Sequence, residues 1–347
     1  MEFLPTLWFI LIGVLWIGYL FLEGFDLGVG MLMKLFARND RQWRLLLNTI
    51  GPVWDGNEVW LLTAGGATFA AFPHWYASLF SALYIPLTLV LIGLIFRAVA
   101  IEYRGKSHRE SSRNLWDWAL AGGSFVAAFG VGAMLALTTT GLPLNANGDR
   151  VGGAFAWLNG YAVLGGLAVV GFCLVHALAF VMLKTDGETR IRARKLLSMW
   201  LLVGLAPMAV WALIVVARSG EVLPWIAVAI AVVGAVSAWL MVRRNKEGLA
   251  FTFLGLFLVA GAASIFWAAY PVVLPSTIDA AFNLTVENAS SSPYTLQLMS
   301  IVAAFGVPLV LAYQGWTYWV FRKRIVERNI PEAHAVEPIV NVLQKVK

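Results

Sequence analysis

Two pairs of acidic residues lie inside stretches of the sequence that are otherwise apolar. Asp55 and Glu58 interrupt the apolar run from residue 50 to 72, and Glu23 and Asp26 interrupt the first apolar run of the chain. Residues three apart share one face of a helix, so both members of each pair are expected to meet the same surroundings. A carboxylate at the bilayer centre costs about 2.5–3.5 kcal/mol, so these faces are expected to look into a helix bundle or onto water.

Acidic groups at this depth point to proton transfer. At 1.5 Å of rise per residue, a continuous helix from Arg44 places Asp55 roughly 16 Å further along, near the middle of a membrane. Antiparallel neighbouring spans pack together, so four carboxyl groups are expected near one another, with at least one holding a proton near neutral pH. Such groups are what a proton relay requires. The alternative is a buried polar clamp that only fixes helix packing.

The composition defines the broad class. The chain has 347 residues, of which 60% are hydrophobic and 13% charged, and its mean hydropathy is +0.77, which predicts a polytopic membrane protein. The net charge of +6 then records topology rather than affinity for nucleic acid. Cys173, the one cysteine, excludes an internal disulfide and a cysteine metal cluster. The first apolar run lacks a basic leading region and a cleavage site, so we expect it to be kept in the mature protein.

Nine apolar segments of about 20 residues or more alternate with short connections. They are 4–33, 50–72, 78–101, 115–137, 159–183, 196–217, 222–242, 250–272 and 295–321. Connections on one side hold 22 of the 25 basic residues, which predicts an external N-terminus and a cytoplasmic C-terminus. No connection is long enough to fold as an extramembrane domain, so residues 1–347 are expected to form one all-α integral-membrane domain of nine transmembrane helices.

A second group of charges closes the third segment. Arg97 lies within this segment, and Glu102 and Lys106 follow at its basic end. Glu102 and Lys106 are four residues apart in the favoured acid-before-base order of a helix. They indicate either a functional charge pair at the cytoplasmic surface or an ordinary solvated pair.

Haem is the first cofactor to consider beside a proton relay, and the histidines argue against a typical site for it. Of four histidines, only His176 lies in an apolar segment, whereas His74 and His108 are in connections and His334 is in the tail. A lone intramembrane histidine is expected to be a hydrogen-bonded core residue. No haem-attachment motif, phosphate loop, dinucleotide fingerprint or nucleophile pattern is present, and we expect no metal site.

Four stretches of the sequence carry a family resemblance. They are EGFDLGVGML (23–32), GPVWDGNEVWLLTAGGATFAAFP (51–73), LTVENASSSPYTLQLM (284–299) and AYQGWTYWVFRKRI (312–325). On these stretches the chain resembles subunit II of the cytochrome bd quinol oxidases, including their cyanide-insensitive relatives. The resemblance runs from the first segment to the ninth, and the WDGNEVWL match is its most specific part.

The resemblance implies a fold, an activity and partners. It implies two four-helix bundles plus one peripheral helix, in a bacterial plasma membrane, paired with a similarly folded subunit I. The complex would couple quinol oxidation to the reduction of oxygen to water. Haem b, haem d and the quinol site would belong to subunit I, and this chain would bind no cofactor tightly. A structural quinone and a small single-span accessory subunit are further expectations, with membrane lipid around the complex and no nucleic-acid partner.

The resemblance also implies site residues. The family's buried aspartate falls on Asp55 beside Trp54, the acid of its first span falls on Asp26, and its cytoplasmic acid and lysine fall on Glu102 and Lys106. The family varies at position 58, where a neutral amide also occurs. The expected proton pathway is therefore Asp55, Asp26, Glu23, Glu58, Glu102 and Lys106, with support from Trp54, Asn57 and Arg97.

Two other functions also account for intramembrane acids. One is a proton-coupled secondary transporter, whose fold usually shows broken helices at matching positions of two halves. Here Pro52, Pro86, Pro207 and Pro308 do not align as repeats, and the acids cluster in the first third of the chain. The other is an assembly subunit that takes no part in turnover.

Overall fold

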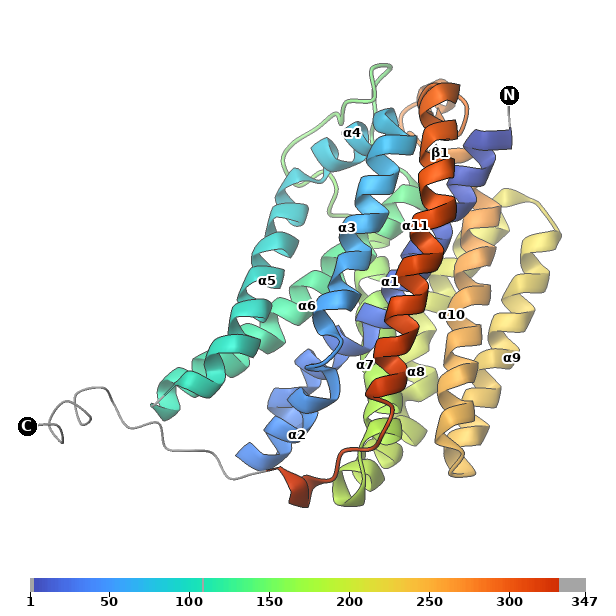
Figure 1. The fold of residues 1–347 in the computed structure, drawn as a ribbon. Helices are drawn as coiled ribbons and strands as arrows, with labels where there is room; N and C mark the ends of the chain where they lie inside the picture. Colours follow the sequence, from blue (N-terminus) through green and yellow to red (C-terminus); the bar gives the residue numbers. More distant parts are fainter. Residues whose placement is uncertain (1–2, 108, 331–347) are drawn as a thin grey trace, which may run out of the picture.

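The chain folds as a polytopic helical protein in the computed structural model, which describes residues 3–107 and 109–330. Eight helices of this part are long and apolar enough to cross a membrane (Figure 1). They are α1 (Phe3–Phe36), α5 (Tyr84–Tyr103), α6 (Glu110–Thr140), α7 (Gly160–Lys184), α8 (Gly187–Ser219), α9 (Leu223–Arg243), α10 (Glu247–Ala269) and α11 (Pro293–Val320). The predicted class of a polytopic helical membrane protein is confirmed.

The segment expected as the second span is α3 (Trp54–Ala71), a helix of 18 residues. It is less apolar than the other eight because Asp55, Asn57 and Glu58 stand in its first two turns. Figure 1 shows α3 running beside α11, and contacts between the two helices agree with that view. Among the nine expected spans, the helix richest in candidate site residues is thus the shortest.

The continuous helix expected from Arg44 to Asp55 is wrong. A separate helix, α2 (Asp40–Ile50), ends before a turn at residues 51–53, and α3 begins at Trp54. Pro52 lies in this turn and has no backbone N–H to continue a helix. Asp55 therefore stands in the first turn of α3, where the helix dipole favours an anion.

Helix α2 is fixed by a cap and by Arg104. The Asn39 side chain accepts a hydrogen bond from the Gln42 backbone N–H at 2.8 Å, a standard N-cap. Arg104 pairs with Asp40, and its guanidinium lies 3.8 Å from the centre of the Trp43 ring. Partial burial opposes ionisation of Asp40, but the bond to Arg104 outweighs it and lowers the pKa of this carboxyl.

The connections hold more structure than the turns we expected. A short helix, α4 (Pro73–Ala82), precedes α5, so the predicted third span is divided at Leu83. The connection before α11 contains β1 (Val272–Leu274) paired antiparallel with β2 (Leu284–Thr285), and η2 (Ala280–Phe282) lies between them. Single turns of 3₁₀ helix follow α5 and α11, namely η1 (Arg104–Lys106) and η3 (Glu327–Asn329).

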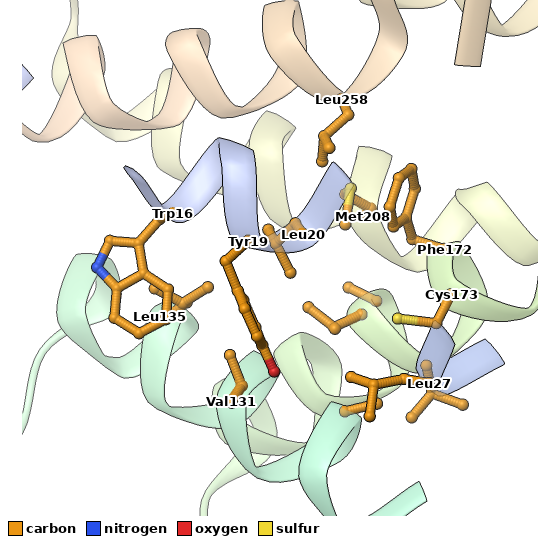
Figure 2. Packing of buried hydrophobic residues seen from close by; sticks show 14 of the residues in the cluster. Trp16, Tyr19, Leu20, Leu27, Val131, Leu135, Phe172, Cys173, Met208 and Leu258 are labelled. Atoms are coloured by element: carbon orange, nitrogen blue, oxygen red, sulfur yellow. The ribbon is translucent and has the colours of Figure 1, made fainter. Parts of the chain in front are cut away.

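The core forms around α1, which packs against α3, α6, α7 and α10. Figure 2 shows side chains of α1 between those of its neighbours, with Tyr19 facing Val131 of α6 and Leu20 near Met208 of α8. Glycines permit the closest approaches. A Cβ added at Gly28 would lie 1.9 Å from the Cys173 carbonyl oxygen, and α6 and α7 meet at Gly132 and Gly165 in the same way. Small residues let membrane helices pack at this distance.

We expect Gly132→Ala to lower the thermal stability of the purified complex. Its new Cβ would lie 2.2 Å from the Gly165 carbonyl oxygen, and overpacking of this kind costs about 1–3 kcal/mol. Gly122→Ala is the matched control on the same helix, because nothing lies within 4 Å of its added Cβ. Thermal denaturation followed by fluorescence measures both variants. Equal midpoints for the two would contradict the close approach of α6 and α7.

Candidate functional site

Arg97 is the centre of a charged cluster inside the protein. It projects from α5, and its side chain is fully buried. Its Nη2 atom lies 2.9 Å from Glu23 Oε1 of α1, and its Nη1 atom donates to Glu58 Oε2 of α3 at 2.9 Å. A guanidinium stays charged in any protein, so its burial requires these carboxylate partners. One side chain thus joins three helices.

Asp26 is held by Asn57 rather than by Arg97. The Asn57 Nδ2 group donates to Asp26 Oδ2 at 2.6 Å and to the Leu22 carbonyl oxygen at 3.3 Å. On the other side of the amide, Asn57 Oδ1 accepts from the Tyr318 hydroxyl at 2.8 Å and from Gln314 Nε2 at 3.1 Å. Helix α11 is therefore connected to the carboxyl cluster through a single amide.

Glu23 and Asp26 stand three residues apart on the same helix, α1. Both side chains are fully buried. Neither Asp26 Oδ1 nor the Glu23 oxygens have a hydrogen-bond donor among the described residues, although Glu23 keeps its ionic contact with Arg97. Glu23 and Glu58 thus contact one guanidinium, and Asp26 lies on the same helix as Glu23. A fully ionised cluster of the three acids would carry two unbalanced negative charges in a buried site.

Asp55 is expected to be buried near the middle of the membrane, but on this chain it is exposed, because α3 begins only at Trp54. Asp55 and Glu102, the acid expected at the cytoplasmic mouth, both lie apart from this cluster. Asp55 and Glu102 are exposed on this chain, and their charges are near enough to repel each other. Asp55 also feels the charge of Arg97, so it stands between the surface and the interior.

The expected helical pair of Glu102 with Lys106 is absent from the described residues. Helix α5 ends at Tyr103, and η1 follows with a tighter pitch, so residues four apart no longer stack. Lys106 Nζ lies instead 4.5 Å from the centre of the Tyr103 ring.

The structure brings together some of the predicted site residues and adds others. Of the four intramembrane acids, Glu23, Asp26 and Glu58 meet, whereas Asp55 lies at the edge. Trp54 is 5.8 Å from the Arg97 guanidinium, measured to its ring centre.

Gln314 and Tyr318 were missed as site residues, as was Trp60, whose Nε1–H donates to Gln314 Oε1 at 2.8 Å. The signal for Gln314 and Tyr318 was a pair of polar groups four residues apart in the last apolar segment.

The surroundings of His176 do not fit a haem ligand. Its Nε2 atom lies 2.9 Å from the Phe21 carbonyl oxygen, so the nitrogen that would bind iron donates a hydrogen bond. The ring stacks on Phe251 and on Phe172, with centroids 4.6 and 5.0 Å away. Across residues 3–107 and 109–330, no three His, Cys, Asp or Glu side chains gather as a metal site. His108 and His334 lie outside the described residues.

Fold and site together define a polytopic membrane protein that buries titratable groups among its helices. The profile of a family described as cytochrome bd terminal oxidase subunit II matches residues 4–321, and the chain belongs to this family. The protein is therefore subunit II of a cytochrome bd-type quinol oxidase, a haem-containing complex in which it works with a subunit I. The secondary-transporter alternative is set aside.

Relatives of known identity match over nearly the whole chain. Cytochrome bd ubiquinol oxidase subunit 2 of Bacillus subtilis is 40% identical over 95% of this chain and 99% of its own length. Cytochrome bd-I ubiquinol oxidase subunit 2 of Escherichia coli K12 is 34% identical over 95% and 97%. The structure of bd oxidase from Geobacillus thermodenitrificans superposes with a TM-score of 0.75 at 18% identity, covering 92% of this chain and 98% of that one, and so shares the fold.

We expect Arg97→Gln to destabilise the complex strongly. Removing one partner of a buried ion pair costs about 3–5 kcal/mol, because the remaining charge is left without compensation. Arg97→Gln combined with Glu23→Gln should recover part of this loss. The control is Arg38→Gln, whose pair with Glu188 is exposed and contributes about 1 kcal/mol or less. Thermal denaturation and the yield of assembled complex measure the three variants. Equal effects at Arg97 and Arg38 would argue against a buried ionic centre.

Proposed function

We propose that this chain conducts protons from the cytoplasm toward the oxygen-reducing haem of subunit I. The observation that carries the proposal is the gathering of Glu23, Asp26 and Glu58 around the buried Arg97. Balancing one guanidinium needs one carboxylate, so the other acids are surplus to a structural ion pair. Reduction of oxygen to water consumes protons, and surplus buried carboxyls are suited to deliver them.

The proton route begins at the surface and ends in the cluster. Glu102, exposed at the end of α5, takes a proton from the cytoplasm with Lys106 at the same rim. Asp55 is the next acceptor, since its charge interacts with that of Glu102. Glu58, half-buried and bound to Arg97, receives the proton from Asp55 and passes it to the Glu23–Asp26 pair.

Arg97 makes the transfer electrically feasible. Its fixed charge stabilises ionised Glu23 and Glu58 in turn, so a proton leaving one carboxyl does not leave an isolated anion. Asn57 holds Asp26 Oδ2 by a donated hydrogen bond and leaves Oδ1 without a partner, so that Oδ1 can accept a proton from Glu23. Each step thus moves a proton between carboxyl oxygens without moving a helix.

The same proposal includes the topology and the cofactors. Nine spans, with α3 as the second, form a single domain in the bacterial plasma membrane, with the N-terminus outside and the basic ends in the cytoplasm. Haem b and haem d belong to subunit I, which accords with the closed surroundings of His176. A structural quinone and a single-span accessory subunit complete the proposed complex.

A purely structural role is the competing function. It is favoured by one observation, the way Arg97 ties α1, α3 and α5 together. Such a clamp needs Glu23 and Glu58 but makes no use of Asp55, which no ion pair holds in the described residues. Asp55 therefore separates the two functions.

We expect Asp55→Asn to yield an assembled, haem-containing complex that loses most of its quinol-driven oxygen uptake, because an amide cannot carry the proton. Oxygen consumption and a reduced-minus-oxidised spectrum of the same sample measure activity and haem content. Asp149→Asn is the control, since Asp149 is an exposed carboxylate in the connection between α6 and α7. Full activity in well-assembled Asp55→Asn would leave only the structural role.

We expect replacement of both Glu102 and Lys106 by Ala to slow turnover more at high pH than at low pH, because a missing proton acceptor matters most where protons are scarce. The pH dependence of oxygen uptake measures this effect. Glu327→Ala with Arg328→Ala removes the same two charges from the connection after α11 and serves as control. A pH profile that matches the control at every pH would remove Glu102 and Lys106 from the route.

A further inference from the structure

A cavity of about 700 Å³ opens between α1, α7, α10 and the segment after α11. Figure 1 shows this segment running from the lower end of α11 toward α2. Ile325 forms a backbone bridge with Thr185, which fixes the segment across the mouth of the cavity. The volume falls within the range of about 300–1,000 Å³ that is usual for ligand pockets.

The inner wall of the cavity is apolar. Phe25 and Phe180 stack there with centroids 3.9 Å apart, and Phe251, Phe21 and Leu183 complete the wall. These residues come from helices that are expected to cross the membrane. The cavity therefore extends from the segment after α11 toward the apolar interior of the membrane. A hydrocarbon chain is the ligand group that such a wall accommodates.

The rim of the cavity is strongly basic. Lys184, Arg322, Lys323 and Arg324 line it. The acid beside them, Glu247, is already bound by Arg190 Nη2 at 2.6 Å, Arg194 Nη2 at 2.5 Å and Arg324 Nη2 at 3.5 Å. One carboxylate therefore faces three guanidiniums.

Lys184 is also engaged, because it donates to the carbonyl oxygens of Phe321 and Lys323. Arg322 and Lys323 are exposed, and no acidic partner is found for either in the described residues. Arg322 lies over the Trp319 ring and donates one hydrogen bond to the Trp319 carbonyl oxygen. The rim thus holds a surplus of positive charge.

We propose that this cavity binds one anionic phospholipid, with its phosphate against Arg322 and Lys323 and an acyl chain along Phe25 and Phe180. A basic rim above an apolar wall matches both halves of such a lipid. A soluble phosphate compound would leave the apolar wall without a partner. A neutral quinone ring would leave the cationic rim without one.

The test is lipid retention by the whole complex. The purified complex is exchanged into detergent micelles that contain equal amounts of phosphatidylglycerol and phosphatidylcholine, and native mass spectrometry counts the bound lipids. We expect one phosphatidylglycerol held in preference to phosphatidylcholine. Each Lys or Arg near a membrane surface contributes roughly a factor of five to binding of anionic lipid, so Arg322→Gln with Lys323→Gln should weaken retention about 25-fold.

Two control variants and one competitor complete the design. Arg244→Gln with Lys246→Gln removes the same charge between α9 and α10, outside the cavity, and should retain the lipid. Arg322→Lys with Lys323→Arg keeps the charge and should also retain it. Equal loss in both Gln pairs, equal retention of the two lipids, displacement by millimolar glycerol phosphate, or a quinone in place of the lipid would each overturn the proposal.

Discussion

The interior of this protein depends on the cost of burying a guanidinium away from water. Arg97 cannot lose its proton, so its position is stable only where carboxylates reach it. Glu23 and Glu58 come from different helices, and both must turn their side chains toward α5. This one requirement fixes how α1, α3 and α5 are rotated about their own axes, which hydrophobic packing alone determines poorly in a membrane.

Close packing around α1 depends on small residues rather than on polar ones. Gly28 lets α1 approach the backbone of α7, and the glycine pair of α6 and α7 closes the other side. The result is a tightly packed centre with a polar cluster on one flank only. Titratable groups are thereby kept in a rigid frame, where proton transfer between fixed oxygens does not need large motion.

The sequence predicted the helices better than it predicted their contacts. Each of the nine apolar segments is largely helical, because hydropathy over about 20 residues is a local property, although the second includes the turn at 51–53 and the third is divided at Leu83. The turn at Pro52 and the 3₁₀ turn after Tyr103 were missed, although proline was a readable signal. The position of Arg97 between Glu23 and Glu58 could not be predicted from the sequence. Pairing between helices depends on the rotation and tilt of each helix, which no single segment encodes. Gln314 and Tyr318 were readable as polar groups four residues apart, but their contact with Asn57 could not be predicted for the same reason.

The amide of Asn57 has a consequence for assembly. Both donors to its oxygen, Gln314 and Tyr318, sit on α11, a helix that is almost wholly exposed on this chain. If α11 shifted outward, the amide oxygen would lose both donors, whereas the Nδ2 group would still donate to Asp26 and to the Leu22 carbonyl oxygen. Contacts on the outer face of α11 therefore influence how firmly the amide that binds Asp26 is held. A protein that packs against α11 in the membrane can thus influence Asp26 without contacting it.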